Sequence, residues 1–275
     1  MKTIGILGTG LMGKSIAVHA AIKGYDIFLY SNRTNNDERD LPKEIKGRMR
    51  NETISTHELV FSKVHINSDL NELKKCDLII EVLSESLDEK RSALVNFKRY
   101  FPNNVIVASN TSSLDVRDIF DGIVDRKQVF GIHFFNPIKH MKLVEVGYLE
   151  ESSRYNIDLV MNFVRSLEKE PILLKASKGY VVNKLLITMI NQASKLLENN
   201  SLRPEEIDQC MVLGANHPTG PLKLSDYIGN DIVLRILENL STDDTSIQIS
   251  KYLQDLVKEK KLGRKTKIGF YDYFD

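Results

Sequence analysis

The sequence has almost no net charge and only two cysteines, and both properties exclude certain classes of function. Lys and Arg total 38 and Asp and Glu total 37 among 275 residues, so the formal net charge is only +1. No overall field therefore favours nucleic acid or a membrane as a partner. The two cysteines, Cys76 and Cys210, fit no metal or redox spacing, which indicates small buried thiols in a reducing compartment and no metal site.

Long apolar runs are also missing. No uninterrupted run approaches the roughly 18 residues that a membrane-spanning helix needs. The N-terminal stretch MKTIGILGTGLMGKSIAVHAA is apolar behind a lysine, but Lys14 and three spaced glycines do not suit a secretory signal. We therefore expect a cytoplasmic protein.

The first half of the chain alternates between strand-like runs and helical segments. Such runs occupy residues 3–8, 25–30, 64–68, 76–82, 103–110 and 127–134, and a polar excursion at 34–63 is expected to contain two short helices. This alternation predicts an α/β fold with a Rossmann-like, doubly wound, mainly parallel sheet. Two further runs, 142–146 and 170–176, are expected to extend the sheet at one edge.

The pattern becomes entirely helical near residues 175–179. Residues 179–200 carry apolar side chains at helical spacing, at Val182, Leu185, Leu186, Met189, Ile190 and Ala193. We therefore predict a dinucleotide-binding domain at 1–178 and an all-helical C-terminal domain at 179–275.

A glycine motif lies between the first strand and the first helix. Gly8, Gly10 and Gly13 form G-x-G-x-x-G, with Leu11 and Met12 inside it. In this context the first glycine permits a tight turn, the second lets backbone approach a pyrophosphate, and the third lets helix and strand pack closely. The motif predicts that all five residues belong to a dinucleotide site.

The end of the second strand bears on the choice of cofactor. An acidic residue that holds the ribose of NAD is expected about 20 residues after the motif, but position 31 is Ser31, with Arg33 two residues further. A hydroxyl and a guanidinium suit a 2′-phosphate. Both NAD and NADP fit the site, and we favour NADP(H) slightly. A solvated Arg33 is the alternative interpretation.

Three polar clusters follow predicted strands, where an open parallel sheet places its functional residues. Each residue alone also has a packing or capping explanation, but three clusters at equivalent positions favour a site. The clusters are Glu81, Glu85 and Lys90; Asn110, Ser112 and Ser113; and His133 and Asn136. Glu145 follows His133 by twelve positions and can meet it if 132–135 and 142–146 are joined by a turn. A carboxylate on one imidazole nitrogen would support proton transfer at the other.

These residues stand in motifs that resemble the L-3-hydroxyacyl-CoA dehydrogenases, particularly the short bacterial 3-hydroxybutyryl-CoA dehydrogenases. The motifs are GILGTGLMGKSIA, SNTSSL, GIHFFNPIKHMKLVEV, GYVVNKLL, LGANHPTGPLKLSDYIG and GRKTKIGFYDY, and the resemblance runs from Lys2 to about Tyr273. This sequence departs from the family pattern at three places. Ser31 stands where the family usually has an acid, Lys267 and Ile268 stand where it usually has Gly and Glu, and the proline that is common before Gly179 is absent.

The resemblance implies a role for each site residue. His133 and Glu145 would be the catalytic acid/base pair, and Ser112 and Asn183 would bind the substrate oxygen. The implied contacts with the cofactor are at Glu85, Lys90, Ser112 and Lys265, and Lys90 would also contact the acyl-CoA. From their positions after predicted strands, we add Asn110 to the cofactor site and Asn136 to the substrate site. The helical domain would close over the substrate and form a homodimer. A carrier-protein thioester, a free small hydroxy acid and a non-catalytic dinucleotide-binding role are the alternatives.

Overall fold

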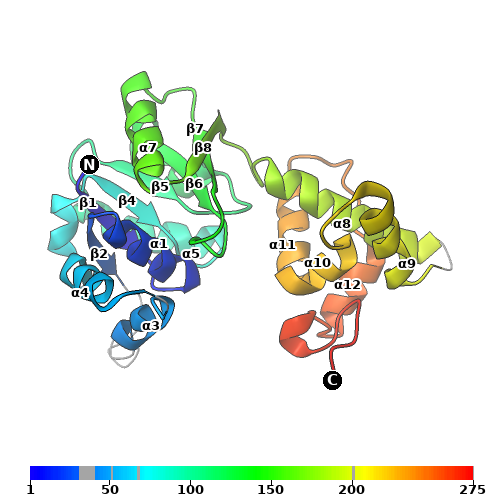
Figure 1. The fold of residues 1–275 in the computed structure, drawn as a ribbon. Helices are drawn as coiled ribbons and strands as arrows, with labels where there is room; N and C mark the ends of the chain where they lie inside the picture. Colours follow the sequence, from blue (N-terminus) through cyan, green and yellow to red (C-terminus); the bar gives the residue numbers. More distant parts are fainter. Residues whose placement is uncertain (31–40, 51, 67–68, 200–201, 275) are drawn as a thin grey trace. The chain divides into compact units, whose positions relative to one another are not determined.

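The computed structural model describes residues 1–30, 41–50, 52–66, 69–199 and 202–274. The chain forms two compact units, Met1–Ser177 and Lys178–Asp275. Figure 1 shows strands with helices on either side in the first unit and helices in the second.

The first unit is built on an eight-stranded sheet with the order β3-β2-β1-β4-β5-β6-β7-β8. Strands β1 to β6 are parallel, β7 is antiparallel to β6, and β8 is parallel to β7. The predicted doubly wound sheet is therefore confirmed, as are β7 and β8, the two strands predicted to extend it at one edge. The strands are β1 (Thr3–Leu7), β2 (Asp26–Tyr30), β3 (Val64–Ile66), β4 (Leu78–Glu81), β5 (Ile106–Ser109), β6 (Val129–Phe134), β7 (Leu143–Tyr148) and β8 (Glu170–Lys175).

Helices cover both faces of this sheet, so most strands are apolar along their whole length. One buried cluster joins strand side chains to α1 (Leu11–Ile22), α3 (Leu41–Arg48), α4 (Ile54–Lys63) and α7 (Arg154–Ser166). A second cluster on the other face involves α5 (Leu87–Phe97) and α6 (Val116–Phe120). The helices α3 and α4 agree with the two predicted in the excursion, whose residues 34–40 lie outside the described part.

The second unit is helical. Its helices are α8 (Val182–Asn199), α9 (Pro204–Gln209), a π-helical turn (Cys210–Gly214), α10 (Pro221–Ile228), α11 (Asn230–Ser241) and α12 (Lys251–Lys258). Ile187 and Ile190 of α8 are buried in its core, whereas Leu185 is 71% exposed. The apolar stripe predicted for this helix therefore includes one residue that does not face the core.

Two further features of the second unit were not predicted. The prediction of a buried Cys210 was wrong, because its thiol is exposed in the π-helical turn; only Cys76 is buried. The C-terminal segment is held by the buried carboxylate of Asp226, which accepts backbone N–H groups from Phe270 at 3.0 Å and Tyr271 at 2.9 Å. These contacts fix the chain that follows Lys265.

None of the described helices is both long and apolar enough to cross a membrane. Across the same parts of the chain, no three His, Cys, Asp or Glu side chains are grouped so that they could hold a metal ion.

Candidate active site at the carboxyl ends of the strands

The glycine loop joins β1 to α1 with little room for side chains. Gly8 has φ +125°, which favours glycine, and a Cβ at this position would lie 2.5 Å from the carbonyl oxygen of Val82. A Cβ on Gly13 would lie 2.0 Å from the carbonyl oxygen of Gly8. A Cβ on Gly10, in contrast, would meet no atom within 4 Å. Backbone atoms thus leave no space for a side chain at Gly8 or Gly13, whereas the space beside Gly10 is open.

This opening fits the pyrophosphate of a dinucleotide. Gly10 is the N-cap of α1, and Leu11, the first residue of the helix, is 54% exposed. The first turn carries no acidic side chain, so the positive end of the helix dipole is not offset there. Met12 packs against the apolar core beside the sheet. The assignment of these loop residues to the cofactor stays a prediction.

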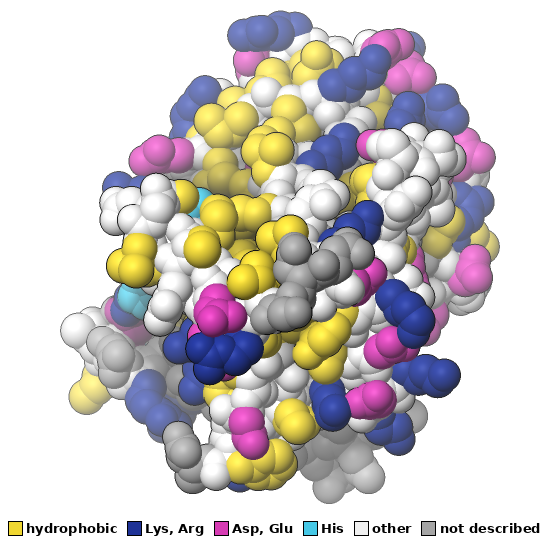
Figure 2. Space-filling view, turned by 90° about the vertical axis from the view of Figure 1, so that its right-hand side faces the viewer, with side chains coloured by type: hydrophobic (Ala, Val, Ile, Leu, Met, Phe, Trp, Pro, Cys, Tyr) yellow, Lys and Arg dark blue, Asp and Glu magenta, His cyan; other side chains and the backbone are white. Residues whose placement is uncertain are grey.

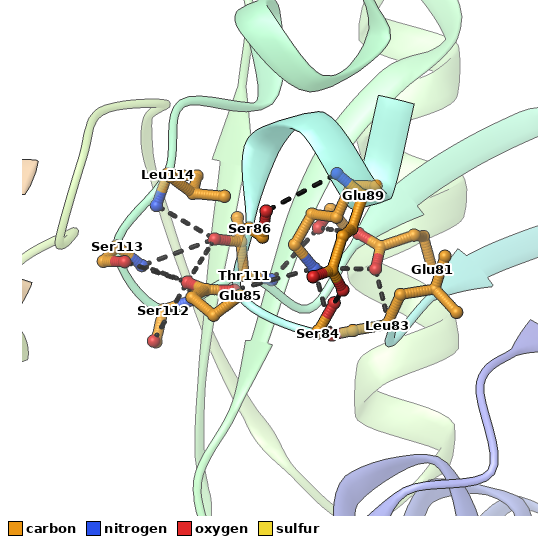
Figure 3. A network of polar contacts seen from close by, with 12 residues as sticks. Glu81, Leu83, Ser84, Glu85, Ser86, Glu89, Thr111, Ser112, Ser113 and Leu114 are labelled. Carbon is orange, nitrogen blue, oxygen red and sulfur yellow. Dashed lines mark hydrogen bonds and ion pairs between the residues drawn. The ribbon is translucent and has the colours of Figure 1, made fainter. Parts of the chain in front are cut away.

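Glu85 organises the loop that follows β5. It lies just before α5, which begins after the N-cap Ser86. Its Oε1 accepts hydrogen bonds from Thr111 Oγ1 at 2.6 Å and from the backbone N–H groups of Ser112 and Ser113 at 2.8 Å each. The hydroxyl of Ser112 also donates to this oxygen, at 3.2 Å (Figure 3). Glu85 thus accepts both the N–H and the hydroxyl of Ser112.

Glu85 is held in its charged form. Burial alone would raise the pKa of its carboxyl, but Lys90 and the hydrogen bonds from Thr111, Ser112 and Ser113 outweigh burial and hold the pKa below its ordinary value. The Nζ of Lys90 lies 3.6 Å from Glu85 Oε2. A charged Glu85 accepts hydrogen bonds only, which matches the donors that surround it.

A buried ion pair lies behind this loop. Lys90 Nζ is 2.6 Å from Glu81 Oε1, and the two side chains are 1% and 0% exposed. Lys90 also donates to the carbonyl oxygen of Leu83 at 3.3 Å. The family resemblance implies that Lys90 contacts the cofactor and the acyl-CoA, whereas its ammonium group in this structure is directed at protein oxygens.

His133 and Glu145 face each other on neighbouring strands. They are directly paired residues of β6 and the antiparallel β7, and His133 Nδ1 lies 2.8 Å from Glu145 Oε2. The side chains are 6% and 2% exposed. The ring of Phe135 lies 4.4 Å from the imidazole, centroid to centroid. The expected meeting of His133 and Glu145 is therefore present, near the carboxyl end of β6.

The other predicted site residues are distributed over both units. The side-chain oxygen of Asn110 accepts the backbone N–H of Phe134 at 3.0 Å, which ties the end of β5 to the end of β6. Asn136 is exposed in the turn after β6. In the second unit, Asn183 is on α8, and Lys265 Nζ lies 2.5 Å from Asp231 Oδ1. Ser31 and Arg33 lie outside the described residues.

Sequence reasoning missed two anchoring residues. Ser109 donates its hydroxyl to Glu81 Oε2 and accepts the backbone N–H of Thr111 at 3.1 Å. Lys169 is buried and donates to the carbonyl oxygens of Ile138 and Met141 in the turn after β6, and burial lowers its pKa. A polar residue at the end of an apolar strand would have indicated Ser109. Lys169, which lies just before β8, has no such local indication.

Models of two domains of one family match almost the whole chain. The description "3-hydroxyacyl-CoA dehydrogenase, NAD binding domain" matches residues 3–177, and "3-hydroxyacyl-CoA dehydrogenase, C-terminal domain" matches residues 179–273. The chain belongs to the 3-hydroxyacyl-CoA dehydrogenase family. The family resemblance read from the motifs is therefore confirmed, as is a nicotinamide cofactor for the first domain.

Individual members of the family are similar over their whole length. The 3-hydroxybutyryl-CoA dehydrogenase of Clostridioides difficile is 38% identical over 281 residues, covering 98% of this chain and 99% of the relative. The mitochondrial hydroxyacyl-coenzyme A dehydrogenase of Rattus norvegicus is 32% identical and covers 99% and 91%. The crystal structure of (S)-3-hydroxybutyryl-CoA dehydrogenase PaaH1 from Ralstonia eutropha has a TM-score of 0.92 at 33% identity and full coverage of both chains. The structure of a diketoreductase has a TM-score of 0.85 at 26% identity, covering 99% of this chain and 99% of the diketoreductase.

Proposed function

We propose that this dehydrogenase interconverts short-chain (S)-3-hydroxyacyl-CoA and 3-oxoacyl-CoA, with 3-hydroxybutyryl-CoA and acetoacetyl-CoA as the substrate pair. The observation that carries the proposal is the 2.8 Å contact between His133 Nδ1 and Glu145 Oε2 in a buried site. A carboxylate on Nδ1 fixes the tautomer of the ring, so that Nε2 becomes the nitrogen that exchanges a proton. The relatives named for this substrate support the choice.

The proton chemistry follows from the residues of the chain. In oxidation, His133 takes the proton from the substrate 3-hydroxyl, and Glu145 stabilises the resulting imidazolium ion. Ser112 and Asn183 orient the substrate oxygen by hydrogen bonding, and Asn136 lines the substrate site. In reduction, the imidazolium returns its proton to the 3-oxo oxygen. The bound dinucleotide supplies or accepts the hydride at C3 of the substrate.

The cofactor site in this proposal is centred on the glycine loop. Gly8, Gly10, Leu11, Met12 and Gly13 would hold the pyrophosphate, since the loop is open at Gly10 and closed at the other two glycines. The side chains assigned around the rest of the cofactor are Glu85, Lys90, Asn110, Ser112 and Lys265. Ser31 and Arg33 favour NADPH over NADH, because a hydroxyl and a guanidinium bind a 2′-phosphate that a carboxylate would repel.

The variant Ser31→Asp with Arg33→Ala tests the cofactor preference. It is expected to shift the ratio of kcat/KM toward NADH by about tenfold to a hundredfold, the range typical of lost charge-assisted hydrogen bonds. Initial rates of acetoacetyl-CoA reduction with NADH and NADPH measure this ratio. Arg154→Ala, at a position 83% exposed on α7, is the control and should leave the ratio unchanged. A parent protein that already strongly prefers NADH would contradict the assignment.

One experiment separates the proposed substrate from its alternatives. Initial rates are compared for acetoacetyl-CoA, an acetoacetyl carrier protein and free acetoacetate. The free compound is included because the diketoreductase neighbour is titled as acting on dicarbonyl compounds. The proposal expects the highest kcat/KM for acetoacetyl-CoA. A higher value for another substrate would replace it, and cofactor binding without turnover of any would indicate a non-catalytic role.

We also propose that the second unit forms a homodimer. Several of its apolar side chains are exposed, including Leu185 at 71% and Leu213 at 83%, and apolar groups lie between charged ones on the face drawn in Figure 2. Leu185→Glu is expected to convert a dimer into a monomer in sedimentation velocity experiments. Leu59→Glu, on α4 of the first unit, is the control. A parent protein that sediments as a monomer at micromolar concentration would exclude the dimer.

A further inference from the structure

The carboxylate of Glu81 is the most enclosed charged group near the Ser112 loop. Glu81 is the last residue of β4 and is 0% exposed. Its Oε1 accepts from Lys90 Nζ at 2.6 Å and from the backbone N–H of Leu83 at 2.5 Å, and its Oε2 accepts from the hydroxyl of Ser109. Both oxygens of Glu81 are therefore occupied inside the protein.

Stability alone does not account for this ion pair. Removing two charges from water has a desolvation cost that their attraction often fails to recover, and well-packed apolar residues are commonly as stable. Lys90 is moreover shared between two carboxylates, since its Nζ lies 2.6 Å from Glu81 and 3.6 Å from Glu85. The ammonium group of Lys90 thus lies between two carboxylates and is closer to that of Glu81, which is fully buried.

The division of Lys90 between the carboxylates has a consequence for Ser112. Glu85 Oε1 receives the donors of the loop, including the N–H and hydroxyl of Ser112. Without the charge on Glu81, Lys90 would have only Glu85 as its counter-ion. The attraction between them would draw Lys90 and Glu85 together, and the hydrogen bonds that orient Ser112 would be weakened. Glu81 is also linked to the loop through Ser109 and the N–H of Thr111.

We infer that Glu81 is a positioning residue for the Ser112 loop. It neutralises Lys90, so that Glu85 remains available to accept the N–H and the hydroxyl of Ser112 (Figure 3). This role rests on the proposed function, because it requires Ser112 to act on a substrate. It adds a residue that does not itself touch substrate or cofactor.

The first test is Glu81→Gln in the full chain. The variant keeps the shape and removes the charge, and we expect kcat for acetoacetyl-CoA reduction to fall by about tenfold to a hundredfold. Amide hydrogen exchange of residues 110–114, measured without cofactor, should become faster, because the N–H groups of Ser112 and Ser113 lose a firm acceptor. Unchanged kcat and unchanged exchange would overturn the inference.

The double variant Glu81→Gln with Lys90→Met distinguishes positioning from other roles. It removes the cation together with the anion, so Glu85 is again free to bind the loop. We expect the slower exchange of residues 110–114 to return, a coupling that only interacting residues give. Turnover is not the readout for this variant, because Lys90 is also assigned to the cofactor and substrate sites. A double variant in which residues 110–114 exchange as fast as in Glu81→Gln would contradict the inference.

Two controls complete the experiment. Glu89→Gln changes an exposed carboxylate on α5, the helix that carries Lys90, and this carboxylate accepts a hydrogen bond from Ser84. The variant should leave kcat and amide exchange unchanged. His133→Ala reports on the proposed function itself. If His133→Ala keeps normal turnover, the proposed function fails; if it loses turnover while Glu81→Gln keeps both kcat and slow exchange, only the role of Glu81 fails.

Discussion

Replacing His133 by alanine is expected to lower kcat for acetoacetyl-CoA reduction by about 100- to 10,000-fold, the usual contribution of a positioned proton donor. The physical reason is the 2.8 Å contact of its Nδ1 with Glu145, which stabilises the charged ring. Initial rates at saturating substrate measure the effect. Dinucleotide affinity, measured by fluorescence titration, should stay within about threefold of the parent value, because the loss concerns a step after binding.

Glu145→Gln is a second test of the same pair, and His65→Ala is the control. Glu145→Gln keeps the size of the partner but removes its charge, so kcat should fall while the fold is retained. His65 is an exposed residue of the edge strand β3, and its replacement by alanine should leave kcat unchanged. Near-normal turnover of His133→Ala at saturating acetoacetyl-CoA would remove this histidine from the proton transfer.

Gly13→Ala is expected to damage both the fold of the first unit and its cofactor site. The new methyl group would lie 2.0 Å from the carbonyl oxygen of Gly8, and backbone at that point has to move. Overpacking of this kind costs about 1–3 kcal/mol, which corresponds to a loss of about 2–12 °C in Tm. Thermal unfolding measures the first effect. Dinucleotide affinity should fall by at least about tenfold, because α1 no longer begins in its original place.

Gly10→Ala separates these two effects. Its methyl group would enter open space in the protein without cofactor, so Tm should stay within about 2 °C of the parent value. Dinucleotide affinity should nevertheless fall, because the second glycine of the motif is where backbone approaches the pyrophosphate. A Gly10→Ala protein that binds as well as the parent would place the pyrophosphate elsewhere.

Much of the fold was predictable because most of its strands are buried on both faces. Runs such as LIIE of β4 and IVAS of β5 are apolar without alternation, and each lies between segments with helix signals. The sequence also predicted that His133 meets Glu145. The antiparallel direction of β7 follows from the short turn between the two strands, which is too short for a parallel crossover.

The remaining features depend on contacts between residues far apart in the sequence. The burial of Glu81 requires both Lys90 and Ser109, which lie 9 and 28 positions away. Lys169 reaches the turn after β6 from 31 positions away. A local pattern contains no information about such pairs, and the same is true of the exposed Cys210. Glu81 could be recognised at the end of its strand, but its contacts with Lys90 and Ser109 could not be predicted.

The pairing of β6 with β7 has a consequence for how this enzyme can diverge. His133 and Glu145 lie opposite each other through the main-chain ladder, so insertions in the intervening turn need not disturb their alignment. A slip of one residue along the ladder would instead send one side chain to the other face and separate the pair. Changes within residues 135–142 can therefore leave the contact between His133 and Glu145 in place.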